Sequence, residues 1–251
     1  MSGHSKWSTI KRKKAKTDAE RGKAFTKVIK EITIAARAGG GDPEANPRLR
    51  TAVMAAKTVN MPRDNILKAI QKGTGELEGV TYEENTYEGY APHAVAVFLE
   101  CTTDNKNRTT AEVRHLFAKH GGNMAENGAV GWIFERQGLI TVSKSAHSEE
   151  EIMDMALEAG ADDIRTDDAD VYEVYTDPAE LHEVLGKMEA AGVAPEGAEL
   201  IRIPQNTITL DEKQAESVLK LVDLLEDHDD INKVWANFDI PADVLEKLGG
   251  E

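Results

Sequence analysis

Apolar residues recur every three or four positions in the first third of the chain, a spacing that predicts amphipathic helices. Between residues 18 and 38, one sector of the helical wheel holds Phe25, Val28, Ile29, Ile32, Ala35 and Ala36. The opposite sector holds Lys23, Lys27, Lys30 and Arg37. Thr17 and Glu20 have the spacing of a capping box at the start of this helix. We therefore expect a helix that buries one face and presents positive charge on the other.

Two shorter helices are predicted after the first. In "GGGDPEANPRLR" the glycines end the first helix, and Asn46 caps a second helix that begins at Pro47. In "NMPRDNILKAIQKG" Pro62 opens a third helix and Gly73 closes it. The residues of the third helix that we expect to face inward are Ile66, Leu67 and Ile70. Residues 1–75 are thus predicted to form a small helical domain.

After Gly79 the pattern changes to strands that alternate with helices. Two runs, at residues 80–91 and 94–103, predict a pair of strands. A helix is expected to begin at Thr109 or Thr110, and residues 129–136 predict a further strand. This part of the chain therefore reads as an α+β domain.

From Leu139 to Pro204 the predicted order is strand, helix, strand, strand, helix, strand, with Ser148 and Glu151 forming a capping box at the first helix. This βαββαβ order is the ferredoxin-like plan. A strand at 207–210, a helix and a strand at 232–240 follow, and we expect them to complete the sheet begun near residue 80.

The order of elements predicts a multi-domain protein of α and α+β type. An N-terminal helical domain covers residues 1–75. A discontinuous central α+β domain covers 76–136 and 205–251. An inserted ferredoxin-like βαββαβ domain covers 137–204.

Charge is distributed unevenly over these domains. The 251-residue chain has a formal net charge of −15, yet residues 1–75 hold 17 Lys or Arg against 6 Asp or Glu. Neutralising phosphates with lysine and arginine releases counterions, so a segregated basic domain favours a nucleic-acid partner. Residues 137–204 hold 4 Lys or Arg against 17 Asp or Glu and lack the aromatic motif of RNA-binding sheets. The acidic domain could restrain nonspecific binding, dock a basic protein, or only add solubility.

The candidate nucleic-acid contacts come from the N-terminal segment and the first helix. They are His4, Lys6, Trp7, Lys11, Arg12, Lys13, Lys14, Lys16, Arg21, Lys23, Lys27 and Lys30. The lysines and arginines would contact phosphates, and Trp7 and His4 would supply stacking or hydrogen bonds. The alternative is that these lysines only solvate a helix surface, but this leaves the scarcity of acids in the same region unexplained.

Catalytic, cofactor and metal motifs are missing from the sequence. It contains no phosphate-binding loop, dinucleotide fingerprint, HExxH pair or GxSxG elbow. Cys101 is the only cysteine, and we expect it to be buried and inert; "DHDD" at 227–230 is expected to be solvated. We therefore predict a non-enzymatic protein with no cofactor, no metal and no small-molecule substrate. No apolar run is long enough to span a membrane.

One polar segment, "DNKNRT" at 104–109, lies between a predicted strand and a helix. Lys106 and Arg108, together with the backbone amides of the helix start, make a candidate anion site. The alternative, which we favour, is turn and cap chemistry by Asp104, Asn105 and Asn107.

The chain resembles the YebC/PmpR family, which includes the mitochondrial translational activator of cytochrome oxidase subunit one. The matching stretches are "GHSKW", "RGKAFTKVIKEI", "GGGDPEANPRLR", "MPRDNI", "YEGYAP", "DNKNRT", "EVRH", "GGN" and "GAVGWIF". The resemblance implies a three-domain protein, cytoplasmic in bacteria, that acts as a DNA-binding transcriptional regulator or, in other members, on ribosomes during translation.

Three functions remain open at this point. The first is a DNA-binding transcriptional regulator. The second is a ribosome-associated translation factor that binds ribosomal RNA, because DNA and ribosomal RNA present a similar density of phosphates. The third is an interaction module that works through its acidic surface.

Overall fold

The computed structural model describes residues 18–249, and its first domain is a unit of three helices. These are α2 (Asp18–Gly39), α3 (Pro47–Thr58) and α4 (Arg63–Thr74). Their shared core includes Ile32 and Ala35, as the apolar spacing predicted, together with Leu49 and Ala56 of α3. The Asn46 side chain accepts a hydrogen bond from the amide of Leu49 at 3.1 Å, which confirms the predicted cap. Thr17, the other predicted cap, lies outside the described residues.

The end of α4 differs from the prediction. Gly73 does not close the helix but lies inside it, where a Cβ would come within 2.4 Å of the Thr33 carbonyl oxygen on α2. The glycine is needed for the close approach of the two helices, and the left-handed cap is Gly75, at φ 84°. Leu67 was expected to face inward, but it is exposed. The buried line of α4 runs through Ile66, Ala69 and Gly73 instead, which turns Leu67 towards solvent.

The central domain contains a four-stranded antiparallel sheet. Its strands are β1 (Glu83–Tyr90), β2 (Ala96–Thr103), β3 (Asn123–Ala125) and β9 (Ile231–Ala236), in the order β3-β1-β2-β9. A separate pair, β8 (Ile208–Thr209) and β10 (Phe238–Asp239), runs parallel. Strands from both sides of residues 134–204 therefore join in one sheet. On this pairing we keep the predicted domain boundaries as a proposal.

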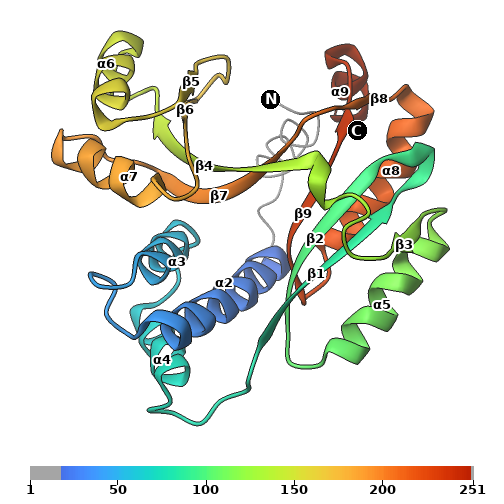
Figure 1. Cartoon of the computed structure of the whole chain (residues 1–251), viewed down its shortest axis with the longest axis horizontal. Helices are drawn as coiled ribbons and strands as arrows, with labels where there is room; N and C mark the ends of the chain where they lie inside the picture. The colour runs from blue at the N-terminus through green and yellow to red at the C-terminus, as the bar shows by residue number, and fades with distance from the viewer. Residues whose placement is uncertain (1–17, 250–251) are drawn as a thin grey trace.

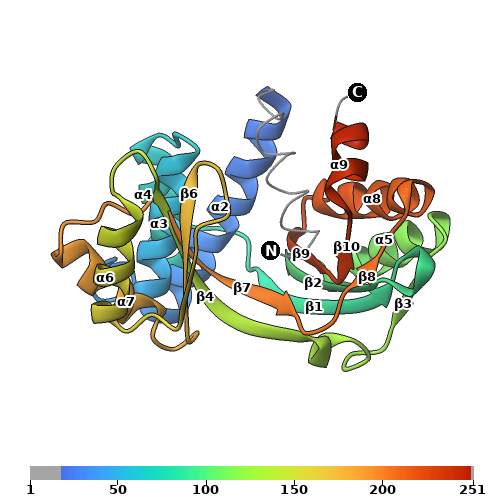
Figure 2. The same ribbon diagram turned by 90° about the horizontal axis from the view of Figure 1, so that it is seen from above.

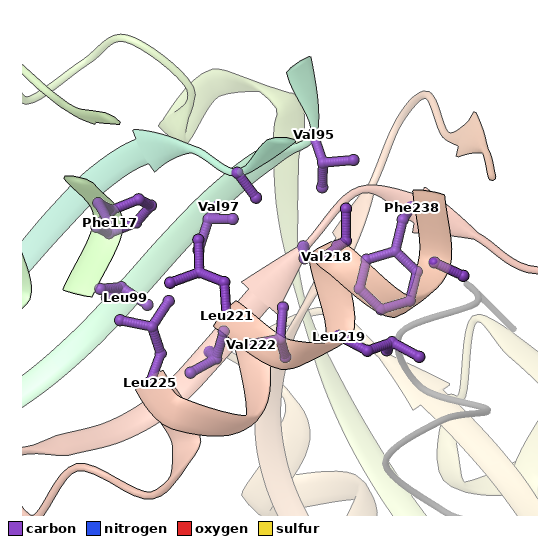
Figure 3. Close-up of a cluster of buried hydrophobic side chains, with 14 of the residues drawn as sticks. Val95, Val97, Leu99, Phe117, Val218, Leu219, Leu221, Val222, Leu225 and Phe238 are labelled. Carbon is purple, nitrogen blue, oxygen red and sulfur yellow. The ribbon is translucent and has the colours of Figure 1, made fainter. Parts of the chain in front are cut away.

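Helices α5 (Lys106–Lys119) and α8 (Glu212–Glu226) pack on the same face of this sheet (Figures 1 and 2), and α9 (Ala242–Gly249) follows β10. Side chains from β2, α5 and α8 point towards one another in a shared core that includes Leu99, Phe117 and Leu221 (Figure 3). Helix α5 starts at Lys106, with Asn105 as its cap, and not at Thr109 or Thr110 as predicted. Thr109 is buried in the first turn of the helix.

The third domain has the predicted ferredoxin-like topology. Its elements are β4 (Phe134–Ser143), α6 (Glu149–Ala159), β5 (Asp163–Arg165), β6 (Val171–Thr176), α7 (Leu181–Ala190) and β7 (Gly197–Pro204). The sheet order is β5-β6-β4-β7, and every pair is antiparallel. The Ser148 and Glu151 capping box is confirmed. The protein is therefore a multi-domain α+β protein.

Strand β4 was predicted as two strands but is continuous, and together with β7 it links the central and third domains (Figure 2). The two strands pair from Phe134 with Pro204 to Thr141 with Gly197. Phe134, the first residue of β4, packs with Phe98 on the central sheet, while Ile140, further along β4, lies in the core of the third domain. Short 3-10 turns, η1 (Pro92–Ala94) and η2 (Gly131–Ile133), precede β2 and β4.

Candidate nucleic-acid interface

Most of the predicted nucleic-acid contacts precede the described residues. His4, Lys6, Trp7, Lys11, Arg12, Lys13, Lys14 and Lys16 lie outside the described range of 18–249, and Arg21 lies in the first turns of α2. The structure therefore bears directly on the side chains of Lys23, Lys27 and Lys30.

The lysine face of α2 contacts the acidic end of α8 and the loop that follows it. The Lys23 ammonium lies 3.4 Å from the Asp227 carboxylate, and both side chains remain partly exposed. Lys27 donates a hydrogen bond to the carbonyl oxygen of Glu226 at 2.5 Å. This face, which the sequence predicted to present its charge outward, forms an interface between the first and central domains.

Lys30 corrects the prediction most clearly, because only 6% of the residue is exposed. Its ammonium donates to the Asp230 carboxylate at 2.7 Å, to the Asp229 carbonyl at 2.8 Å and to the Thr102 carbonyl at 3.2 Å. All three donor positions are used, so in this arrangement the charge of Lys30 is not available to a phosphate. A helical wheel shows only which residues of α2 share a face. It could not show that the polar face of α2 also packs against another part of the chain.

Asp230 is the centre of this interdomain contact. Beside Lys30, its carboxylate accepts hydrogen bonds from Arg108 at 2.8 Å, Thr109 at 2.7 Å and Thr103 at 3.1 Å. Burial alone would raise the pKa of Asp230, but the hydrogen bonds from Lys30, Arg108 and Thr109 outweigh it and hold this pKa well below its usual value. The carboxylate is therefore ionised, and it connects α2, α5 and β2.

The segment "DNKNRT" contributes Arg108 and Thr109 to the contact around Asp230. Its other polar groups cap and pair locally. Asn105 caps α5 by accepting from the amide of Arg108 at 3.1 Å, as the favoured interpretation predicted. The Arg108 guanidinium donates to Asp104 at 2.7 Å and to Asp230, and these hydrogen bonds raise its pKa. Lys106 is exposed in the first turn of α5. Arg108 is already paired with three carboxylates, those of Asp104, Asp230 and, at 4.0 Å, Glu112. The candidate anion site at Lys106 and Arg108 therefore remains a prediction that the local charges oppose.

An open cleft of about 960 Å³ lies beside this network. It is lined by α2, α5 and the segment after α8, with five carboxylates against the cations of Lys23, Lys30 and Arg108. Glu112, His228 and Asp230 come close together there. His228 Nδ1 accepts from the amide of Asp230 at 3.1 Å and its Nε2 lies 3.0 Å from Glu112, so the imidazole is already engaged on both sides. We assign no metal site to this group.

Other cations of the first domain are exposed. They are Arg37 at the end of α2, Lys57 in α3, and Arg63, Lys68 and Lys72 in α4. Within residues 18–249 none of them forms an ion pair. The prediction omitted them as contacts, although Lys68 and Lys72 are already recognisable in the sequence as an i, i+4 pair on the polar face of α4.

The described part of the chain contains no helix that is long and apolar enough to cross a bilayer. Cys101 is buried, as predicted, and burial raises the pKa of its thiol to about 12. A thiol with so high a pKa stays protonated at neutral pH, which makes Cys101 a poor nucleophile.

Comparison with known proteins covers the full chain. A family model described as the TACO1/YebC protein N-terminal domain matches residues 5–76, and one described as the TACO1/YebC second and third domain matches residues 82–238. A probable transcriptional regulatory protein of Sulfurihydrogenibium sp. is 58% identical over 251 residues, which is 100% of both chains. One from Desulfotalea psychrophila is 56% identical over 99% of both. The crystal structure of a conserved hypothetical protein from Aquifex aeolicus superposes with a TM-score of 0.82 at 52% identity, covering 90% of this chain and 93% of that one.

Proposed function

The chain belongs to the TACO1/YebC family, and from that premise we propose that it is a non-enzymatic, nucleic-acid-binding regulator that acts as a DNA-binding transcriptional regulatory protein in the cytoplasm. The relatives described above that carry a functional name are named probable transcriptional regulatory proteins. The proposal assigns no cofactor, metal or small-molecule substrate to the protein.

The observation that carries the proposal is the segregation of charge. Residues 1–75 hold 17 Lys or Arg against 6 Asp or Glu in a chain with a net charge of −15. A basic region of this kind attracts a phosphate backbone through counterion release. Salt screens electrostatic interactions over about 8 Å at physiological ionic strength. The negative charge of the third domain therefore does not cancel the positive potential of basic residues that lie several such lengths away.

The proposed phosphate contacts are Lys6, Lys11, Arg12, Lys13, Lys14, Lys16, Arg21, Lys23 and Lys27, with His4 and Trp7 contributing hydrogen bonds or stacking. Lys30 is omitted because its ammonium is buried on Asp230. Lys23 and Lys27 would have to exchange their contacts at the end of α8 for phosphates. The residues before α2 therefore make the larger contribution.

The test is the salt dependence of DNA binding by the full chain. In one variant Lys11, Arg12, Lys13 and Lys14 are changed to Gln. In the control, Lys144, Lys187, Lys213 and Lys220, which lie in the third domain and α8, are changed to Gln. A plot of log K against log salt has a negative slope. The magnitude of this slope should decrease by roughly 3 to 4 in the first variant, because each lost phosphate contact contributes about 0.9. The control should keep the wild-type slope, and equal slopes in all three proteins would refute the proposal.

Ribosome binding is the competing outcome of the same experiment. Co-sedimentation with ribosomes that resists salt, combined with weak and sequence-independent DNA binding, would make ribosomal RNA the ligand and the protein a translation factor. The same Gln variant should then lose its affinity for ribosomes, since the phosphate contacts would be shared.

A further inference from the structure

Trp132 is the most exposed of the large apolar side chains in the described part of the chain, at 67%. It lies in the η2 turn just before β4, inside the "GAVGWIF" segment. A single exposed apolar residue needs no explanation by itself. The loop that carries Trp132, however, is held by unusually specific contacts.

A buried carboxylate fastens this loop to the central sheet. Glu88 of β1 accepts hydrogen bonds from the amide of Gly128 at 2.7 Å, Val130 at 2.6 Å and Gly131 at 2.8 Å. Burial would raise the pKa of Glu88, but the three amides outweigh it and lower this pKa. The carboxylate is therefore charged and uses its charge to fix the backbone on both sides of Ala129.

The indole is held by the same loop. Its Nε1 donates to the carbonyl oxygen of Ala129 at 3.1 Å, directly between the fastened amides. Val130 and Ile133, on either side in the sequence, are buried with Phe98 and Phe134. The exposed ring thus has a fixed position before any partner arrives, which lowers the entropy cost of binding.

The exposed residues that neighbour Trp132 in the sequence are polar, and they bear on which partner fits. They are Glu126, Asn127, Glu135 and Arg136. The other exposed large apolar residues of the described chain belong to α4, the 77–80 segment, α6 and β7. An aromatic anchor in a protein interface sits at the centre of a desolvated apolar patch, and no such patch adjoins Trp132 along the chain. A nucleobase needs only one free ring face and tolerates polar neighbours.

We propose that Trp132 is a preorganised stacking platform for an unpaired nucleobase, and that the exposed Arg136, four residues further along the chain in β4, contacts an adjacent phosphate. The inference rests on the proposed nucleic-acid binding and adds a second contact, on the central domain, outside the basic N-terminal region. Its ligand is single-stranded or locally unpaired, because a base within a duplex does not offer its face.

The test measures binding of the full chain to a fluorescein-labelled single-stranded RNA, the same-sequence single-stranded DNA, and the matched duplexes. Trp132→Ala should weaken binding of one or both single strands by about 5- to 150-fold, the range for loss of one stacked base. It should leave duplex binding unchanged. Trp132→Phe should retain most of the affinity. Leu157→Ala removes another exposed apolar side chain, on α6, and should bind like the wild type.

Tryptophan emission gives a second readout. Binding of the single strand should quench a component of the emission that is missing in Trp132→Phe. Wild-type affinity of Trp132→Ala for both single strands, or an equal loss on strands and duplexes, would overturn the stacking assignment and leave the proposed function intact. Failure of the wild-type protein to bind any of the probes would instead refute both.

Discussion

The buried pair of Lys30 and Asp230 makes a quantitative prediction about how the first domain is held. Replacing Lys30 by Met keeps an unbranched side chain but removes the ammonium and its three hydrogen bonds. Breaking one side of a buried ion pair costs about 3 to 5 kcal/mol. We expect a loss of about 3 kcal/mol in the free energy of unfolding, the low end, because Asp230 keeps Arg108, Thr103 and Thr109 as donors.

Asp230→Asn should cost more, about 4 to 5 kcal/mol, because it leaves the buried ammonium of Lys30 without a counter-charge. The free energies are to be measured by urea unfolding followed by far-ultraviolet circular dichroism. The double variant should lose less than the sum of the single losses, since both remove the same interaction. Lys72→Met, an exposed lysine of α4, is the matched control and should change stability by no more than about 0.5 kcal/mol. A loss below about 1 kcal/mol for Lys30→Met would refute the buried pair.

The same pair predicts a pH dependence. The pKa of Asp230 is lowered in the folded chain. Its contribution to the free energy of unfolding is therefore fully present above the ordinary Asp pKa of about 4. It is lost as the pH falls from about 4 towards the lowered value. The stability difference between the wild type and Asp230→Asn should therefore be constant near neutral pH and shrink below about pH 4. A difference that grows on acidification would contradict the assignment.

Three further predictions concern single positions. Gly73→Ala should lower the free energy of unfolding by about 1 to 3 kcal/mol, because the added Cβ would overlap the Thr33 carbonyl oxygen and force α2 and α4 apart. Calorimetry measures this loss, and an unchanged stability would argue against the close approach of the two helices. Cys101 should not react with a thiol reagent at about pH 8 in the folded protein and should react at once in denaturant, as absorbance would report. Glu88→Gln should cost about 1 to 3 kcal/mol and increase the mobility of Trp132, seen as lower emission anisotropy; unchanged anisotropy would refute the role of the carboxylate in fixing this loop.

The helices and the topology were largely predictable because they follow from local patterns. The spacing of apolar residues predicted α2, and the capping box at Ser148 gave the start of α6. The order of strands and helices after Leu139 predicted the ferredoxin-like sheet. The misplaced boundaries have tertiary causes: Gly73 is buried against α2, and Thr109 donates to Asp230, a residue that is distant in the sequence.

The candidate interface was less predictable, because the polar side of a helix does not reveal what it contacts. Lys23, Lys27 and Lys30 meet the acidic end of α8, about 200 residues later in the chain. The sequence showed both charge clusters but not their contact. Trp132 was visible only as part of a motif, since its exposure depends on amides that Glu88 holds from another strand.

The paired strands β4 and β7 have a mechanical consequence for the third domain. Both chain crossings between the central and third domains lie in one hydrogen-bonded ribbon, anchored at its base by Phe134 on Phe98. A ribbon of two strands bends across its thin direction far more easily than it stretches. Met54 of α3 packs against the core of the third domain, however, so such a bend also has to separate the third domain from the first.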